Sequence, residues 1–262
     1  MKMLEADISK KLKNFDLDLR FEAEDGCLGI LGASGCGKSM TLKAVAGLVR
    51  PDRGKIRRDG SVLFDSGRGI DLPPQKRQVG YLFQDYALFP NMTVAQNIEA
   101  GLLRSRQDKS ARREQVRRLI CQFRLEGLEN QYPARISGGQ QQRTALARIF
   151  ASDARCILLD EPFSTMDSYL REEMQMELAR MIRKFGGCMV LVSHDRDEIY
   201  RLCGRTMIME KGRNVICGQT QVPFDQPRKL AAARLTGCKN ISRIQKARDY
   251  QIYANDWNVM LC

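Results

Sequence analysis

Residues 32–39 read GASGCGKS, which matches the phosphate-binding loop pattern GxxxxGK followed by Ser or Thr. A short apolar strand is predicted before this loop and a helix after it, as the motif requires. Glycine lets backbone N–H groups curl around phosphate oxygens, and the helix N-terminus adds donors and the positive end of the helix dipole. Lys38 can reach the β- and γ-phosphates, and the Ser39 hydroxyl can bind Mg²⁺. The predicted nucleotide-binding residues of this loop are Gly32, Ala33, Ser34, Gly35, Cys36, Gly37, Lys38, Ser39 and Met40.

Two carboxylates stand at the end of the apolar run CILLD, residues 156–160. Such a run is typical of a strand that is buried on both faces of a parallel sheet. Asp160 ends the strand, where a carboxylate can hold Mg²⁺ or its water shell beside the phosphates. Glu161 follows directly and can polarise an attacking water as general base. The sequence therefore predicts a hydrolytic site with Ser39 and Asp160 at the metal.

Two more polar residues end predicted strands. His194, the only histidine, ends the run LVSH, and the C-terminal ends of parallel strands lie along one rim of a sheet. We therefore expect His194 near Asp160, where a neutral imidazole can hydrogen-bond the γ-phosphate or the attacking water. Gln84 ends the short strand in YLFQ, and its amide can both bind Mg²⁺ and orient water. Both residues are predicted to be catalytic, and Gln84 also to be a metal ligand.

A second glycine-rich stretch, ISGGQ at residues 136–140, opens a predicted helix and contains no lysine. Ser137, Gly138 and Gly139 present a hydroxyl and free N–H groups at the helix N-terminus, which makes an anion site. The first loop already encloses the phosphates of one nucleotide. A second site without its own lysine fits a head-to-tail dimer, in which residues 137–140 of each chain, including Gln140, close over the nucleotide of the other.

Hydrophobic periodicity indicates the elements that must position these residues. The segment FDLDLRFEAEDG, residues 15–26, alternates like a half-buried antiparallel strand. The helix after the phosphate loop carries apolar residues at helical spacing from Leu42 to Val49 and is predicted to stop at Pro51. Residues 86–150 are predicted to be mainly helical. This order predicts antiparallel strands, then a strand–loop–helix unit, then a helical insertion.

Two continuous apolar runs, residues 156–160 and 189–193, follow as buried strands separated by a helix, so the predicted fold class is α/β. Past Pro227 the alternation returns in NISRIQKARDYQIYANDWNVMLC. This pattern is typical of the first strands of a separate small β unit.

Composition narrows the class of protein. The formal net charge is +12, from 43 Lys and Arg against 31 Asp and Glu, and much of the excess lies in residues 104–118. We interpret that run as the solvated face of a helix, because no aromatic residues interleave with it as on a platform for single strands. The nine cysteines show no CxxC spacing, which argues against a zinc site. Neither a signal peptide nor an apolar run of about 20 residues is present, so we expect a chain that is neither secreted nor membrane-spanning on its own.

Taken in order, GASGCGKS, Gln84, ISGGQ, LLDEP, STMD and His194 resemble the nucleotide-binding subunit of an ATP-binding cassette (ABC) transporter, over about residues 1–240. The resemblance implies a P-loop NTPase (RecA-like) core with an N-terminal antiparallel β subdomain and a helical insertion subdomain at about residues 86–150. It also implies ATP and Mg²⁺ as cofactors. The sequence departs from the family pattern at Ile136, where Leu is usual, and in STMD, where SALD is commoner.

The resemblance implies further residue roles. Asp167, in STMD, shapes the dimer interface in this family. An aromatic residue near the N-terminus stacks on adenine, and Phe15 is the nearest candidate. Residues 85–98, DYALFPNMTVAQNI, correspond to the groove that receives a helix of the membrane permease. The alternative for the apolar residues of this segment, Leu88 and Phe89 above all, is the core of the helical subdomain.

The resemblance implies an ATPase that works as a homodimer on the cytoplasmic face of the membrane. Permease subunits on separate chains would bind it directly, and an external solute-binding receptor would act on it indirectly. The predicted division is an ATPase domain at residues 1–230, then residues 231–262 as a linker and the start of a truncated regulatory β domain. The linker AAARLTGCKNISRI most closely resembles that of importers for molybdate and tungstate. Importers for sulfate, polyamines or sugars remain alternatives.

Two other classes of function compete with this interpretation. A cassette ATPase that acts on DNA would suit the positive charge, but such proteins usually carry long coiled coils or zinc-bearing insertions, and neither sustained heptads nor CxxC pairs occur here. We therefore predict no nucleic-acid partner. A regulatory module that binds ATP without turnover would have lost its base, yet Glu161, His194 and Lys38 are all present.

Overall fold

The computed structural model describes residues 4–83, 85–103, 108–152, 154–164, 166–239, 241–242, 244–248, 251–256 and 259–261. Its main feature is an 11-stranded sheet with the order β6-β5-β4-β1-β2-β11-β10-β3-β9-β8-β7. The strands of this sheet are β1 (Leu4–Lys11), β2 (Asp16–Ala23), β3 (Gly26–Gly32), β4 (Arg53–Arg58), β5 (Ser61–Asp65), β6 (Ile70–Asp71), β7 (Val79–Leu82), β8 (Cys156–Asp160), β9 (Cys188–Ser193), β10 (Arg205–Glu210) and β11 (Arg213–Gln219).

The sheet has two parts with different strand directions. Strands β10, β3, β9, β8 and β7 run parallel to one another, whereas β2, β1, β4, β5 and β6 pair with one another in antiparallel fashion. Strand β11 joins the two parts, because it pairs antiparallel with β10 and parallel with β2. All residues of β8 and β9 are buried, as their continuous apolar runs predict. Strand β2 alternates between exposed and buried residues, as expected of a half-buried antiparallel strand. The α/β prediction is confirmed.

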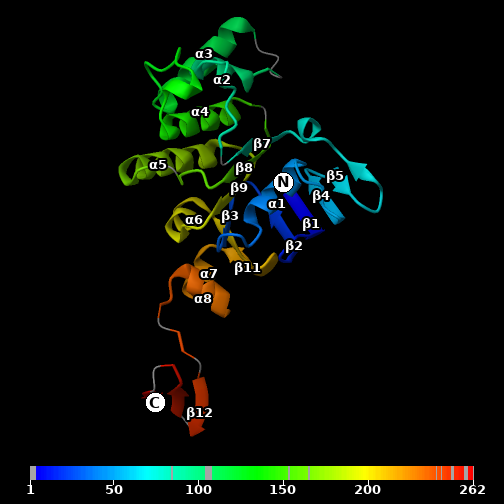
Figure 1. The fold of residues 1–262 in the computed structure, drawn as a ribbon, viewed down its shortest axis with the longest axis vertical. Helices are drawn as coiled ribbons and strands as arrows, with labels where there is room; N and C mark the ends of the chain where they lie inside the picture. Colours follow the sequence, from blue (N-terminus) through cyan, green and yellow to red (C-terminus); the bar gives the residue numbers. More distant parts are fainter. Residues whose placement is uncertain are drawn as a thin grey trace.

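Helices cover and extend this sheet (Figure 1). They are α1 (Lys38–Ala46), α2 (Val94–Ala100), α3 (Lys109–Gln122), α4 (Gly138–Ala151), α5 (Ser168–Lys184), α6 (Arg196–Leu202), α7 (Gln221–Asp225) and α8 (Leu230–Thr236), with 3₁₀ turns at Pro74–Lys76 and Pro133–Arg135. In Figure 1, α2, α3 and α4 gather at one end of the molecule, beyond α5. The segment predicted to be mainly helical thus contains three helices joined by loops, among the residues that the structure describes.

The C-terminal residues form a second, three-stranded antiparallel sheet from β12 (Ile244–Arg248), β13 (Gln251–Ala254) and β14 (Val259–Leu261). The alternating pattern after Pro227 predicted strands here. Within the segment predicted as a linker, α8 forms a short helix that ends at Thr236, with Gly237 as its C-cap at a φ of 107°. Among the described helices, none combines the length and the apolar character that a bilayer-crossing segment needs.

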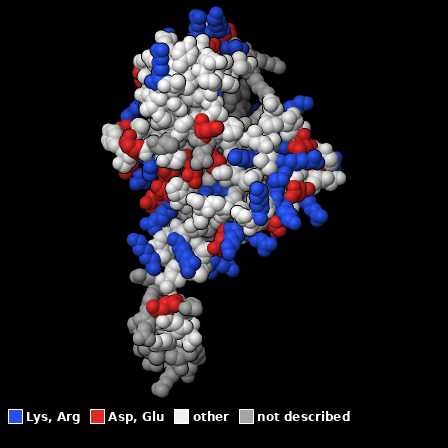
Figure 2. Space-filling view, viewed as in Figure 1, with Lys and Arg blue, Asp and Glu red and all other residues white. Residues whose placement is uncertain are grey.

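Basic residues are distributed over several regions of the surface. Figure 2 shows Lys and Arg at the end that carries α3, around β4 and β5, and near α7 and α8, with acidic residues between them. On α3, Arg113, Arg117 and Arg118 are exposed, while Val116 and Leu119 are buried. This helix therefore presents a solvated basic face, as its charge run predicts.

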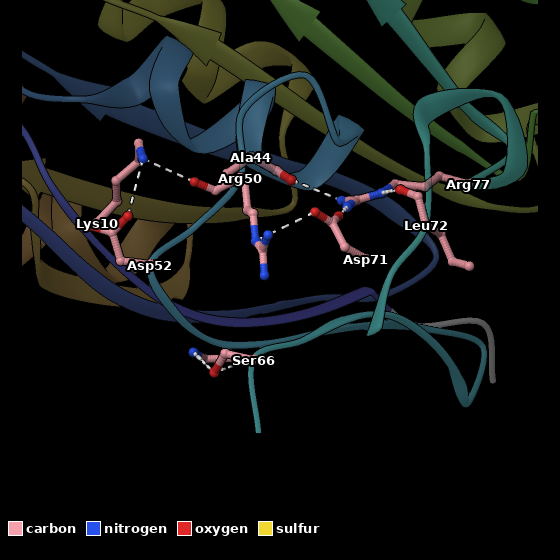
Figure 3. A network of polar contacts seen from close by, with 9 residues as sticks. Lys10, Ala44, Arg50, Asp52, Ser66, Asp71, Leu72 and Arg77 are labelled. Atoms are coloured by element: carbon pink, nitrogen blue, oxygen red, sulfur yellow. Dashed lines mark hydrogen bonds and ion pairs between the residues drawn. The ribbon is translucent and has the colours of Figure 1, made fainter. Parts of the chain in front are cut away.

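Helix α1 is shorter than its apolar pattern predicts. It ends at Ala46, because Gly47 adopts a left-handed conformation with φ 80° and its N–H donates to the carbonyls of Ala44 and Lys43. Arg77, which is fully buried, donates to the carbonyl of Ala44 at 2.9 Å (Figure 3). It also donates to the carbonyl of Val45 at 2.8 Å. The last carbonyls of the helix are therefore satisfied from outside it, so the chain can turn before Pro51.

Gly47 is expected to be required for this turn. A Cβ atom there would lie 2.5 Å from Nε of Arg77, which is itself held by Leu72 and Asp71. We expect Gly47→Ala to lower the free energy of unfolding by about 2–5 kcal/mol, from left-handed strain and overpacking together. Urea unfolding measures this loss.

Gly60→Ala provides the matched control. Gly60 has nearly the same φ, 78°, but nothing lies within 4 Å of the Cβ position. Only the backbone strain should remain, about 1–2 kcal/mol. Equal losses in the two variants would contradict the role assigned to the Arg77 contact.

Candidate nucleotide-binding site

The phosphate loop joins the buried end of β3 to the N-terminus of α1, at the C-terminal edge of the parallel strands. Gly37 precedes the helix with φ 108°, and a Cβ atom there would lie 3.0 Å from side-chain atoms of Leu17 and Met209. At Gly32, a Cβ atom would lie 2.6 Å from the Met209 carbonyl oxygen. Glycine is therefore needed at Gly37 by its left-handed conformation and at Gly32 by the lack of space for a Cβ atom, as the motif predicts.

Lys38 is directed into the loop and is only 5% exposed. Its ammonium donates hydrogen bonds to the carbonyls of Gly32 at 2.7 Å and Ala33 at 3.0 Å. Cys36 is also buried, and this burial raises the pKa of its thiol. Its side chain therefore stays protonated and acts as a small packing group, while Lys38 supplies the positive charge of the loop.

A cavity of about 590 Å³ opens over this loop. This volume suits a nucleotide-sized ligand. The cavity is lined by the loop residues Ser34, Gly35, Gly37, Lys38, Ser39 and Met40, by residues 12–15, and by Glu161. Phe15, from the turn between β1 and β2, is half-buried on this wall. The structure thus places the predicted adenine-stacking residue beside the phosphate loop, although Phe15 precedes the start of that loop at Gly32 by 17 positions in the sequence.

A hydroxyl and a carboxylate meet at the predicted metal position. The Oγ atom of Ser39 donates to Oδ1 of Asp160 at 2.8 Å, and Asp160 is 4% exposed at the end of β8. Hard oxygen ligands of this kind fit Mg²⁺, which usually takes one or two protein groups together with phosphates and water. The described part of the chain contains no group of three or more His, Cys, Asp or Glu side chains that could hold a metal ion.

Tyr81 is a member of this site that the sequence analysis missed. Its hydroxyl donates to Oδ2 of Asp160 at 3.0 Å, so both carboxylate oxygens accept a hydrogen bond. Burial and the nearby Asp160 charge raise the pKa of the Tyr81 phenol, which keeps it a donor. The one available signal is its position, three residues before Gln84 in the strand that leads to it.

The two predicted catalytic residues that the structure describes lie together. Nδ1 of His194 is 3.2 Å from Oε2 of Glu161. Strands β8 and β9 are parallel neighbours with Asp160 opposite Val192, which aligns the ends that carry these side chains. Glu161 has a φ of 49° and donates its backbone N–H to Val192 at 3.0 Å. A left-handed non-glycine residue at this position is typical of a functional site.

Glu161 and His194 line a small cavity of about 50 Å³, together with Ser193 and Glu198. Ser193 links two other residues that line this cavity. Its Oγ donates to Glu198 at 2.7 Å and accepts from the N–H of Asp195 at 2.9 Å. Burial raises the pKa of Glu198. These contacts hold the turn that carries His194, and the sequence analysis did not identify Glu198. Gln84 lies outside the described residues.

The second predicted anion site begins helix α4. Ser137 is its N-cap and accepts from the N–H of Gln140, whose side chain accepts in return from the N–H of Ser137 at 2.8 Å. Asp167 caps α5 in a similar way, by accepting from Leu170 at 2.9 Å. Among the described residues, none of 137–140 lines the cavity at the phosphate loop. The two predicted anion sites are therefore not joined into one site within a chain.

Comparisons with known proteins identify the family. Residues 12–164 match the family described as ABC transporter. The chain is 39% identical over 230 residues to the spermidine/putrescine import ATP-binding protein PotA of Oleidesulfovibrio alaskensis, covering 88% of this chain and 59% of that protein. It is 37% identical over 227 residues to the molybdenum import ATP-binding protein ModC of Paramagnetospirillum magneticum, covering 86% and 61%.

A solved structure agrees with these relatives. The ATP-binding cassette MJ0796, in a dimeric post-hydrolysis state bound to ADP and Pi, superposes with a TM-score of 0.72 and 26% identity, covering 84% of this chain and 99% of that one. The chain spans 59% and 61% of the lengths of the two curated relatives. The chain shares its fold with that cassette, and its phosphate loop opens on a cavity of nucleotide size. Together with the match of residues 12–164 to the family, these features show that the chain belongs to the ABC transporter family.

Proposed function

We propose that this chain binds ATP with Mg²⁺ and hydrolyses it to ADP and phosphate. The observation that carries the proposal is the contact of Ser39 with Asp160 beside a cavity whose wall also includes Glu161. Lys38 and the loop N–H groups bind the phosphates, and Ser39 and Asp160 hold the metal. Mg²⁺ supplies charge neutralisation on the phosphate oxygens. Phe15 stacks on the adenine.

Glu161 is the general base in this proposal. Its carboxylate reaches the same cavity as Lys38, so it can accept the proton of a water that attacks the γ-phosphate. His194 contacts Glu161 at 3.2 Å and holds the carboxylate or the γ-phosphate oxygens. Gln84 orients the water and completes the metal shell. The Glu198–Ser193 contact supports the turn of His194 from behind.

The working unit is a head-to-tail dimer. Ser137, Gly138, Gly139 and Gln140 of one chain bind the nucleotide on the phosphate loop of the other, and Asp167 shapes the interface. The exposed position of Ser137 and its absence from the cavity walls within the chain support this arrangement, for the residues that the structure describes. The solved relative MJ0796 is dimeric with ADP and Pi, which agrees with it.

The ATPase is proposed to drive an importer as a peripheral protein on the cytoplasmic face, with permease subunits bound at residues 85–98. An external solute receptor would act on it only through those subunits. Within this segment, Tyr86 is 8% exposed and belongs to the core of the helical end, so it does not present its ring to a partner. Phe89 and Met92 are 47% and 37% exposed and remain candidates.

The buried side chain of Asn97 fixes the loop that carries Phe89 and Met92. Asn97 is fully buried, accepts from the N–H of Phe89 at 2.8 Å and donates to the carbonyls of Phe89, Met92 and Thr93. Arg148 of α4 donates to the carbonyls of Tyr86 and Ala87. The loop is therefore attached to the helix whose N-terminus carries the second anion site. This attachment supports coupling between nucleotide state and permease.

Met92→Glu is expected to uncouple hydrolysis from transport. The charge would be desolvated in an apolar permease contact, while the nucleotide site would be unchanged. We expect the amount of solute transported per ATP hydrolysed to fall roughly tenfold or more. A tenfold fall corresponds to a loss of about 1.4 kcal/mol of binding free energy between the ATPase and the permease. The measurement is solute uptake and ATPase rate in vesicles containing the co-purified permease. Met176→Glu on α5, where Met176 is 57% exposed, is the control. Normal uptake by the Met92 variant would place the contact elsewhere.

The proposed solute is a polyamine or a tetrahedral oxyanion such as molybdate. The relatives named for spermidine/putrescine and for molybdenum import match this chain at 39% and 37% identity, a difference too small to separate them. The deciding experiment is ligand binding by the receptor that docks on the assembled transporter. Binding of spermidine supports the polyamine, binding of molybdate supports the oxyanion, and binding of sugars alone contradicts both.

A further inference from the structure

Tyr81 and Asp160 lie on one face of two adjacent strands. Tyr81 is opposite Leu158 in the parallel pairing of β7 with β8, and Asp160 follows two residues later on the same face. The Tyr81 hydroxyl therefore reaches Oδ2 of Asp160 at 3.0 Å, while Ser39 occupies Oδ1 at 2.8 Å. The two donors approach the carboxylate from different elements, β7 and α1.

A second cavity of about 370 Å³ opens at this contact and is lined by Ser39, Lys43, Tyr81, Phe83, Asp85 and Asp160. The ring of Tyr81 packs against Phe83 at 4.6 Å between centroids, which restricts its rotation. The phenol oxygen is therefore held in place by ring packing and not only by the hydrogen bond. A carboxylate with both oxygens fixed presents a single orientation to a cation.

We propose that Tyr81 is a positioning residue that orients the Asp160 carboxylate, so that Oδ1 faces Ser39 and the metal. This inference rests on the proposed function, since it assumes that Mg²⁺ and nucleotide bind at this site. Tyr81 is not among the described residues that line the cavity over the phosphate loop, so we expect it not to contact the phosphates. Its loss should therefore weaken metal binding without weakening metal-free nucleotide binding.

The test compares wild type, Tyr81→Phe and Tyr200→Phe. Each variant removes one hydroxyl from a ring that stays in place. Tyr200→Phe is the control, because Tyr200 lies on α6, is half-exposed and packs beside Phe224. Mn²⁺ replaces Mg²⁺, and its affinity for the ADP-bound protein is measured by electron paramagnetic resonance. A fluorescent ADP analogue measures nucleotide affinity in EDTA.

We expect Tyr81→Phe to weaken Mn²⁺ binding roughly three- to tenfold, the effect of losing one hydrogen bond to a charged group. Affinity for ADP in EDTA should equal that of wild type, and Tyr200→Phe should match wild type in both measurements. Unchanged or tighter Mn²⁺ binding by Tyr81→Phe would overturn the inference, as would an equal loss of ADP affinity in EDTA. A wild-type protein that binds neither ADP nor ATP would instead overturn the proposed function.

Discussion

Glu161→Gln is expected to lower the rate of ATP hydrolysis about 10²–10⁴-fold, the usual effect of removing a general base. The amide keeps the shape of the side chain, so it preserves the cavity wall that Glu161 shares with Lys38. It cannot accept a proton from water at neutral pH. ATP binding should therefore remain near that of wild type, and the variant should accumulate as an ATP-bound dimer.

The measurement pairs steady-state phosphate release with equilibrium ATP binding. Glu114→Gln is the control, because Glu114 lies on α3 and pairs only with Arg117 and Arg118 among the described ion pairs. That variant should hydrolyse ATP at the wild-type rate. Near-normal hydrolysis by Glu161→Gln would show that another group takes the proton, and the contact of Glu161 with His194 would then need a different role.

Ser137→Arg is expected to abolish ATP-driven dimerisation. Ser137 is exposed at the N-terminus of α4, where an arginine would add bulk and remove the hydroxyl that caps the helix. Loss of an N-cap costs about 0.5–2 kcal/mol, which weakens α4 but does not unfold the chain. Nucleotide binding by the monomer should remain, since the phosphate loop is untouched. Light scattering in the Glu161→Gln background measures the dimer, and Ser110→Arg, on the exposed face of α3, is the control.

Mixed dimers separate a site shared between chains from a site within one chain. When Lys38→Ala and Ser137→Arg chains are combined, a head-to-tail dimer pairs the intact Lys38 of one chain with the intact Ser137 of the other. One competent site then remains, and hydrolysis should reach at most half of the wild-type rate. If each site were built within one chain, every site would carry a defect and the mixture would be inactive. Full dimerisation of the Ser137→Arg chain would also contradict the shared site.

The sequence alone predicted the chemistry proposed for each segment of the site and determined the type of element that carries it. Three apolar runs that are buried on both faces lead into the site. The first comes before the phosphate loop, the second ends at Asp160 and Glu161, and the third comes before His194. Such motifs can be recognised from the sequence, because the conformation of a glycine and the burial of a strand depend mainly on neighbouring residues in the chain. The convergence of Asp160 and His194 on one rim also follows, since parallel strands share an edge.

Only the tertiary structure decided which distant side chains support these segments. Tyr81 reaches Asp160 across 79 positions of sequence, and Arg77 ends α1 across 33. Tyr86 lies in the segment predicted to receive the permease, but it is buried in the core of the helical end. Periodicity predicts which face of an element is apolar, but it contains no information on strand order or register. Packing across the whole sheet decides strand order and register. These in turn determine that the Tyr81 hydroxyl lies next to the Asp160 carboxylate and the Arg77 guanidinium next to the end of α1.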